Sequence, residues 1–174
     1  MVALLLSGFF IQARTWIKWL SVLFILPWAE PSIPTILSLR FMLNPEWGLI
    51  NQLIFRLTFE DGPNWLNNPT IALFMAMLVH IWKSLPFWTL ILIAGRLAIP
   101  DDLYEAASVD GASRFQTIRH IIVPLLKPIS LACIVTLTIS FFNIIVIPLD
   151  MTVGGALTAT ETISLRLYRE GFQY

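Results

Sequence analysis

Ionisable residues inside long apolar stretches are the first candidates for chemistry in this sequence. Lys83 lies 12 residues into the 25-residue run from Ile71 to Gly95. If that run crosses a bilayer, a charge near its centre costs about 2.5–3.5 kcal/mol and needs a wet cavity or a partner. The spacing i, i+3, i+4 and i+7 places four side chains on one helical face: His80, Lys83, Ser84 and Phe87.

Catalytic chemistry has little support elsewhere in the sequence. His80 and His120 are the only histidines, and no cysteine–histidine cluster has metal-ligand spacing. The single Cys133 excludes an internal disulfide and falls in an apolar run, where we expect it to be a small buried filler. No G-x-x-x-x-G-K-[ST] loop is present, so we expect no nucleotide cradle and no cofactor. A membrane-embedded enzyme, with only His80, Lys83 and scattered carboxylates to use, is the weakest hypothesis.

The composition indicates which elements must position these residues. The sequence is 57% hydrophobic and 13% charged, with a mean hydropathy of +0.76. A soluble domain is about 45–50% apolar, so we predict an all-α integral membrane protein built as a helical bundle. The equal numbers of basic and acidic residues, 11 of each, leave no electrostatic footprint for nucleic acid.

Three apolar runs have the length of roughly 20 residues that a membrane-crossing helix needs. They are Leu20–Leu39, Ile71–Gly95 and Ile129–Leu149. The run from Met1 to Ile11 has about half that length, so we predict about three full transmembrane helices plus a partial N-terminal one. Prolines predict kinks in the first two runs because they leave backbone groups without partners: Pro27, Pro31, Pro34 and Pro86.

The distribution of lysine and arginine predicts the orientation. The positive-inside rule places the more basic side in the cytoplasm, which predicts a cytoplasmic loop at 99–124 and an extracytoplasmic loop at 40–70. In the outer loop the stretches NPEWG, EDGPN and NNP indicate compact irregular structure. Six basic residues fall on the inner side, Arg14, Lys18, Arg96, Arg114, Arg119 and Lys127, and four on the outer side, Arg40, Arg56, Arg166 and Arg169.

The cytoplasmic loop reads EAASVDGASRFQTIRHIIVP from residue 105 to residue 124. Pro100 and the two aspartates after it favour the start of a short helix over Leu103–Ser108. Gly111 is the expected left-handed stop, and the SRFQ stretch that begins at Ser113 has the spacing of a capping box for a second short helix. Pro124 would mark the entry into the next span. Such a pair of helices either seats in a groove of another protein or lies on the bilayer surface.

The same loop carries a spacing known from one family. The residues EAA at 105–107 are followed after three residues by Gly111, after nine more by Ile121, and then by Pro124. This pattern resembles the EAA loop of ATP-binding-cassette importer permeases, with Val123 where the family usually has leucine. The stretches at 24–51, 82–87 and 99–113 are similar to the first-subunit permeases of carbohydrate importers of the maltose and glycerol-phosphate type.

The resemblance implies a coupling role for the loop. In that family the loop docks in a cleft of a cytoplasmic ATPase and transmits its nucleotide-driven closure to the spans. By analogy Glu105 would pair with a basic residue of the ATPase, and Asp110 to Phe115 would form the inserted helix, with Phe115 as an apolar anchor. The residues implied in coupling are Glu105, Ala106, Ala107, Asp110, Gly111, Ala112, Ser113 and Phe115.

The resemblance also implies a path for a sugar. The family has a W-x-G-x-P-aromatic pattern near its sugar site, where this sequence has Ser84 in place of glycine, and an F-N pair on the following span. The sequence departs from the family after that pair, so the sugar stays open. Two interpretations of Lys83 remain: it faces the solute, or it pairs with a carboxylate of a neighbouring helix and holds the bundle together. The residues implied in the path are His80, Lys83, Ser84, Phe87, Phe142 and Asn143.

The family implies several partners. They are a cytoplasmic ATPase dimer that hydrolyses ATP, a second permease subunit, an extracytoplasmic solute-binding protein, a sugar or related solute, and membrane lipid. The expected location is the cell membrane of a prokaryote, with several crossings. Family members have six or more spans, so we interpret residues 1–174 as a partial transmembrane domain that is truncated at both ends. The alternative to a transporter subunit is a non-transporting remnant of one.

Overall fold

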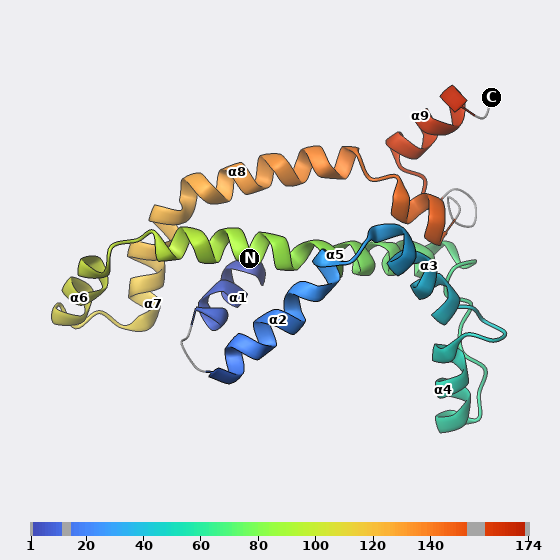
Figure 1. The fold of residues 1–174 in the computed structure, drawn as a ribbon, viewed down its shortest axis with the longest axis horizontal. Helices are drawn as coiled ribbons and strands as arrows, with labels where there is room; N and C mark the ends of the chain where they lie inside the picture. Colours follow the sequence, from blue (N-terminus) through green and yellow to red (C-terminus); the bar gives the residue numbers. More distant parts are fainter. Residues whose placement is uncertain (1, 12–14, 153–158, 173–174) are drawn as a thin grey trace. The chain divides into compact units, whose positions relative to one another are not determined.

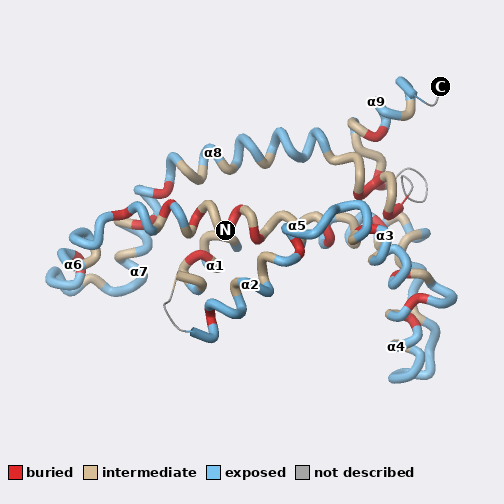
Figure 2. The backbone as a smooth tube through the Cα atoms, in the orientation of Figure 1, coloured by how far each residue is buried: buried red, intermediate tan, exposed pale blue. Residues whose placement is uncertain are grey.

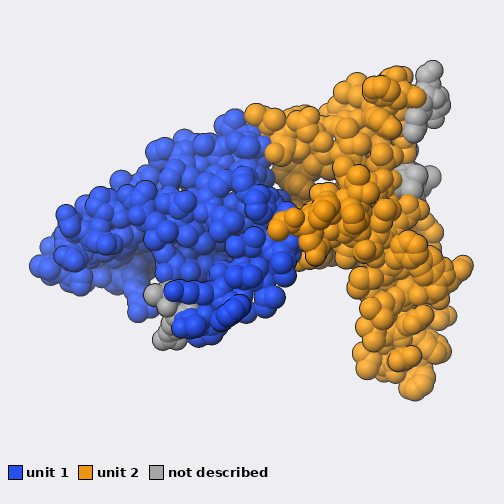
Figure 3. Space-filling view, viewed as in Figure 1, with its two compact units in different colours: residues 1–28, 84–138 blue, residues 29–83, 139–174 orange. Residues whose placement is uncertain are grey.

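The computed structural model describes residues 2–11, 15–152 and 159–172, and every element assigned in those ranges is helical (Figure 1). The predicted all-α class is therefore confirmed. Arg14, which entered the count of basic residues, and the glycine pair at 154–155 lie outside the described residues. The chain divides into two compact units, residues 1–28 with 84–138 and residues 29–83 with 139–174 (Figure 3).

Two helices are long and apolar enough to cross a membrane. The first is α5 (Pro69–Leu97), and the second is a continuous helix that joins α7 (Arg114–Thr117), the π-helical η1 (Ile118–Ile122) and α8 (Val123–Phe142). A third crossing is counted if α2 (Thr15–Ala29) and α3 (Ser32–Met42) form one broken span. The predicted count of about three spans is reached when the broken pair is counted as one crossing, and α1 (Val2–Phe10) lies where the short N-terminal helix was expected.

The predicted boundaries of the last span were wrong. The helix that was expected over Ile129–Leu149 begins upstream of that run and ends at Phe142. Asn143 stops it, because its side-chain amide donates to the carbonyl of Ile139 at 2.8 Å, which occupies one of the last helical acceptors. A separate π-helical turn, η2 (Ile147–Met151), follows.

Proline explains where the first span breaks. Pro27 stays within α2, whereas α2 ends at Ala29 and α3 begins two residues after Glu30. Pro31 caps the start of α3 with φ −56° and ψ 133°, an extended conformation that a helix cannot continue through. The predicted kink is thus a full interruption of the helix.

Each unit has a small core of its own. In the first unit Ile99, Ile122 and Leu126 are buried, and Gly95 allows close packing, since a Cβ there would lie 2.6 Å from the Cδ1 of Ile129. In the second unit α3, α5 and η2 share one core, and most of the chain outside these two clusters is exposed or half-buried (Figure 2). The buried members of the second core are Ile36, Leu43, Val79, Ile147 and Met151.

The loop at 40–70 is more regular than the sequence predicted. It contains the ten-residue helix α4 (Leu49–Thr58), whose buried Asn51 organises the surrounding turns. The Nδ2 of Asn51 donates to the carbonyls of Pro45 at 3.1 Å and Pro63 at 3.3 Å, and its Oδ1 accepts from the indole nitrogen of Trp65 at 2.6 Å. The expectation of compact but irregular structure was wrong because it was based on the turn-forming residues and overlooked the helical stretch between them.

A second proline leaves a carbonyl without its helical donor. In an α-helix the carbonyl of residue i accepts from the N–H of residue i+4, and for Ile144 that residue is Pro148, which has no N–H. The hydroxyl of Thr162, one residue before α9 (Ile163–Phe172), donates to the Ile144 carbonyl at 2.9 Å instead. The Thr162 side chain thus ties the C-terminal segment to the end of the last span.

We expect Thr162→Val to lower the free energy of unfolding by about 0.6–1.7 kcal/mol, the range for hydrogen bonds inside membrane proteins. The penalty should shrink in a Pro148→Ala background, because residue 148 then supplies an N–H. Detergent-induced unfolding measured by circular dichroism checks this.

Thr136→Val is the matched control. The Thr136 hydroxyl bonds only to the Ala132 carbonyl of its own helix, at 2.9 Å, so its loss should change little. An equal penalty for Thr162→Val with proline or alanine at 148 would contradict the explanation.

Candidate functional site

The loop at 99–124 begins with α6 (Asp101–Val109), which carries Asp101 and Asp102 in its first turn. Its end has two characteristic hydrogen bonds, from the N–H of Ala112 to the carbonyl of Ala107 at 2.9 Å and from the N–H of Gly111 to the carbonyl of Ser108 at 3.1 Å. This is a Schellman motif, and Gly111 has the required left-handed φ of +71°. The predicted helix and its glycine stop are confirmed.

The second half of the loop starts with the predicted capping box. The amide of Ser113 donates to the Oε1 of Gln116 at 2.7 Å, and the amide of Gln116 donates to the Oγ of Ser113 at 3.4 Å. The helix that follows does not stop before the span, so the expected boundary at Pro124 was wrong. Pro124 cannot donate to the carbonyl of His120, and the π-helical η1, with the Val123 N–H on the Ile118 carbonyl, carries the helix past it.

The turn between α6 and α7 encloses a hollow of about 400 Å³. Apolar side chains stand exposed on the helices around it: Val109 is 86% exposed, Phe115 is 69% exposed and Ile118 is 41% exposed. Glu105 is also exposed, and Ala107 is buried where the helices approach. Lining residues of the hollow include Leu103, Ala106, Ala107, Asp110, Gly111 and Gln116.

The structure brings the predicted coupling residues together on this one turn. Ala106, Ala107, Asp110, Gly111 and Ala112 line the hollow. Ser113 caps the following helix, and Glu105 and Phe115 are exposed beside it. A pair of short helical segments with an apolar rim and an exposed carboxylate can bind a groove that offers apolar surface and a cation.

The predicted path residues are distributed along α5 and the end of α8. His80 contacts Phe141 with ring centroids 4.9 Å apart and ring planes tilted by 51°, beside a mainly apolar hollow of about 300 Å³. Phe87 stacks on Trp28 with centroids 5.3 Å apart. The exposed Phe142 and Asn143 do not line the hollow, although they adjoin it in sequence.

Sequence reasoning missed several residues of the hollow beside His80. Phe141 contacts the histidine, whereas the sequence analysis chose its neighbour Phe142. The position of each phenylalanine around the helix could have told the two apart. Glu161 also lines the hollow and accepts from Arg169 at 3.2 Å, a pair whose side chains are about 20% exposed. No local signal in the sequence joins residues 159–162 to α5.

Outside the spans, α9 also contains an ion pair between two of its own residues. Arg166 Nε donates to Glu170 Oε1 at 3.0 Å. This hydrogen bond, with the negative charge of the same carboxylate, raises the pKa of the Arg166 guanidinium. Arginine is charged at physiological pH in any case, so the pair does not act as a switch.

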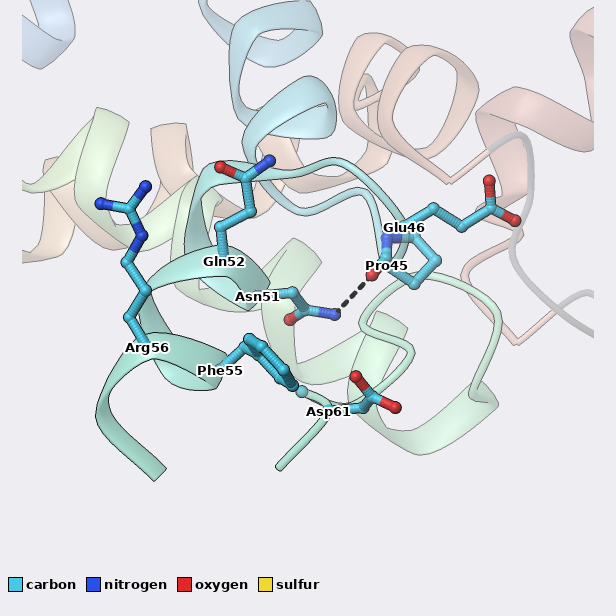
Figure 4. Close-up of a pocket in the computed structure, with 8 residues that line it drawn as sticks. Pro45, Glu46, Asn51, Gln52, Phe55, Arg56 and Asp61 are labelled. Atoms are coloured by element: carbon cyan, nitrogen blue, oxygen red, sulfur yellow. Dashed lines mark hydrogen bonds between the residues drawn. The ribbon is translucent and has the colours of Figure 1, made fainter. Parts of the chain in front are cut away.

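A second hollow, of about 330 Å³, lies on the loop at 40–70. Figure 4 shows Phe55 between Arg56 on one side and Asp61 on the other, with the Asn51 amide bonded to Pro45 behind them. Its side chains are largely exposed and carry both charges, so the hollow favours no single class of ligand.

Comparison with known proteins decides the family. Residues 2–171 match the family described as binding-protein-dependent transport system inner membrane component. The chain belongs to this family. The trehalose/maltose transport system permease protein MalF of Thermococcus litoralis is 40% identical over 84% of the chain and 49% of its own length. The sulfoquinovosyl glycerol transport system permease protein SmoG of Agrobacterium fabrum is 37% identical over 83% of the chain and 47% of its own length.

The fold has solved counterparts. A bacterial alginate ABC transporter, crystallised with its alginate pentasaccharide-bound periplasmic protein, contains a chain that matches 98% of this one with a TM-score of 0.79 at 24% identity. This chain covers 60% of that protein and about half the length of the curated permeases above. The helical membrane fold predicted from the sequence is therefore the fold of a known importer permease.

We expect Gly111→Ala to destabilise the loop, because an L-residue at φ +71° costs about 1–2 kcal/mol. A new Cβ at Gly111 would meet nothing within 4 Å, so the penalty comes from the backbone alone. Hydrogen exchange of the amides in α6 and α7 checks this, with faster exchange expected.

Gly171→Ala is the matched control. Gly171 lies in α9, and a Cβ there also meets nothing within 4 Å, but its φ is not positive. Alanine should therefore be neutral or stabilising at 171. Unchanged exchange in Gly111→Ala would contradict the role assigned to the left-handed turn.

Proposed function

We propose that the chain acts as a transmembrane permease subunit of an ATP-binding-cassette importer and couples to a separate cytoplasmic ATPase. The observation that carries this proposal is the Schellman turn at Gly111, which presents exposed apolar side chains and Glu105 on a chain of this permease family. Apolar anchors that stand more than half exposed are a common feature of protein docking surfaces.

The continuity of the helix after the loop supports the coupling role. From Arg114 to Phe142 the chain is helical without interruption, so a push on the capped start at Ser113 acts on the whole span. Val109 and Phe115 stand exposed on the two helices that flank the turn, which supports docking into a groove of another protein.

The proposed cargo is a saccharide or a related small solute. Two of the similar permeases carry sugar names, trehalose/maltose and sulfoquinovosyl glycerol. In this chain the hollow beside His80 offers an aromatic surface from Phe141 and polar groups from Thr160 and Glu161. The family resemblance adds Ser84, Phe87, Phe142 and Asn143 as further candidates for the path.

The proposal includes a set of partners and an orientation. A cytoplasmic ATPase dimer would bind the loop at 99–124, a second permease would complete the path, and a solute-binding protein would approach the outer loop at 40–70. The excess of lysine and arginine near α6 and α7 supports the cytoplasmic side for this loop.

Glu105→Ala should uncouple ATP hydrolysis from uptake in a transporter reconstituted with its partner subunits. A buried charge pair broken on one side loses about 3–5 kcal/mol, whereas an exposed pair loses less than about 1. Pull-down of the ATPase and uptake into proteoliposomes are the measurements.

Asp102→Asn, in the first turn of the same helix, is the matched control and should leave coupling intact. Normal uptake by Glu105→Ala would refute the contact. A complex that includes the unaltered chain, assembles, and still transports nothing would favour the non-transporting alternative.

His80→Leu tests the path. Loss of the imidazole should raise the KM for the transported saccharide by about two- to twelvefold while basal ATP hydrolysis stays unchanged, because a polar contact to a solute hydroxyl is worth about 0.5–1.5 kcal/mol. His120→Leu, on the exposed surface of η1, is the control. Equal uptake kinetics for both variants would exclude His80 from the path.

A further inference from the structure

The helix α4 has an apolar stripe that nothing in the described part of the chain covers. Leu49, Leu53 and Leu57 recur every four residues, which places them on one side of the helix, and Leu57 is 81% exposed. Ten helical residues rise about 15 Å, whereas the hydrocarbon core of a bilayer is about 30 Å thick, so α4 is too short to cross. The stripe therefore needs a surface to rest on.

Another side of α4 is already packed against the protein. The buried Asn51 binds the surrounding turns, and Ile50 packs against the core that α3, α5 and η2 share. In this unit α4 runs across the direction of the first half of α5 (Figure 1). Because α5 crosses the membrane, a helix held across it extends along the membrane plane. The packing thus turns the leucine stripe outward on a helix that lies parallel to a bilayer surface.

Aromatic side chains connect the stripe to a helix that lipid already surrounds. Trp47, two residues before α4, contacts Phe41 of α3 with ring centroids 5.0 Å apart, and both side chains are exposed. The helix α3 is the second half of the broken span. Tryptophan is favoured where acyl chains meet the headgroups. An exposed apolar surface therefore continues from the span through Trp47 to the start of the stripe.

The end of α4 has features of the same kind. Phe59 follows the helix with φ 59°, a conformation that L-residues other than glycine rarely adopt, and its side chain is 82% exposed. Arg56 is exposed and stands two helical turns after Leu49, at the edge of the stripe. A guanidinium in that position can reach lipid phosphates while the leucines contact acyl chains.

We propose that α4 is an interfacial helix that anchors the loop at 40–70 to the membrane surface. Leu49, Leu53, Leu57 and Phe59 would lie at the boundary of the acyl chains, and Arg56 would bind lipid phosphates. The three leucines are not among the described residues that line the hollow of Figure 4, so that hollow stays open to the water phase. The inference depends on the membrane fold and not on transport.

A fluorophore on the stripe tests the contact in lipid nanodiscs that hold the chain and the subunits that purify with it. Cys133→Ala removes the single cysteine, and Leu53→Cys or Leu57→Cys then carries an NBD label. Thr58→Cys is the control, because Thr58 is exposed more than a quarter turn from the stripe. The probe is phosphatidylethanolamine and phosphatidylglycerol with brominated acyl chains. The labels at 53 and 57 should lose most of their emission, and the label at 58 should keep most of it.

Iodide in the water phase provides the opposite measurement. If iodide quenches the labels at 53 and 57 as strongly as the label at 58, the stripe lies in water and the proposal is overturned. If neither bromine nor iodide reaches the stripe, a protein surface covers it, and the proposal is overturned as well. The quenching pattern is the same whether or not the complex transports a solute, so it is independent of the proposed function.

Hydrogen exchange of the α4 amides gives a second readout that needs no label. Leu53→Asp places a carboxylate in the lipid contact and should make these amides exchange severalfold faster in the nanodiscs. Gln52→Asp is the matched control: it introduces the same side chain one position earlier, more than a quarter turn around the helix, and should have little effect. Equal exchange in the two variants would overturn the proposal.

Discussion

The architecture depends on how backbone carbonyls are satisfied where proline removes their donors. Prolines inside apolar helices orphan the carbonyl four residues earlier, and lipid offers no water to replace the lost N–H. At the break after α2 the ammonium of Lys83 donates to the carbonyl of Glu30, and after α8 the hydroxyl of Thr162 donates to the carbonyl of Ile144. Around Pro124 the helix widens into a π-helical turn instead. Each solution fixes a neighbouring element in place.

The third of these solutions matters most for the loop. A break at Pro124 would have separated the turn at Gly111 from the span. The π-helical η1 instead keeps α7, η1 and α8 as one helix. The Schellman turn at Gly111 ends α6 on the other side, so the loop has one rigid attachment and one tight bend. This is the mechanical arrangement that the proposed coupling requires, because force applied at the turn reaches the membrane through a continuous helix.

The parts of the structure that follow local rules could be predicted from the sequence. The helix ends at Gly111 and Ser113 depend on neighbours within a few residues, and both were correct. The helix α4 and the contact of His80 with Phe141 were missed. The first was obscured by the turn residues on either side, and the second depends on which of two adjacent phenylalanines faces α5. Partners distant in sequence, such as Lys83 and Glu30, left no periodic signal.

Proline spacing nevertheless contains part of that missing information. Counting back four residues from Pro148 is enough to identify Ile144 as an acceptor in need of a donor, and the pair Glu30–Pro31 marks the break before α3. The surroundings of the acceptor then limit which donor can serve. A hydroxyl is enough near the end of a span, whereas the break at Glu30 also holds a carboxylate, whose charge a hydroxyl cannot balance. Lysine meets both demands at once, with a long flexible stem that reaches the carbonyl and a charge opposite to that of Glu30. The break at Glu30 and the lysine that reaches it therefore belong to one contact, although they lie 53 positions apart in the sequence.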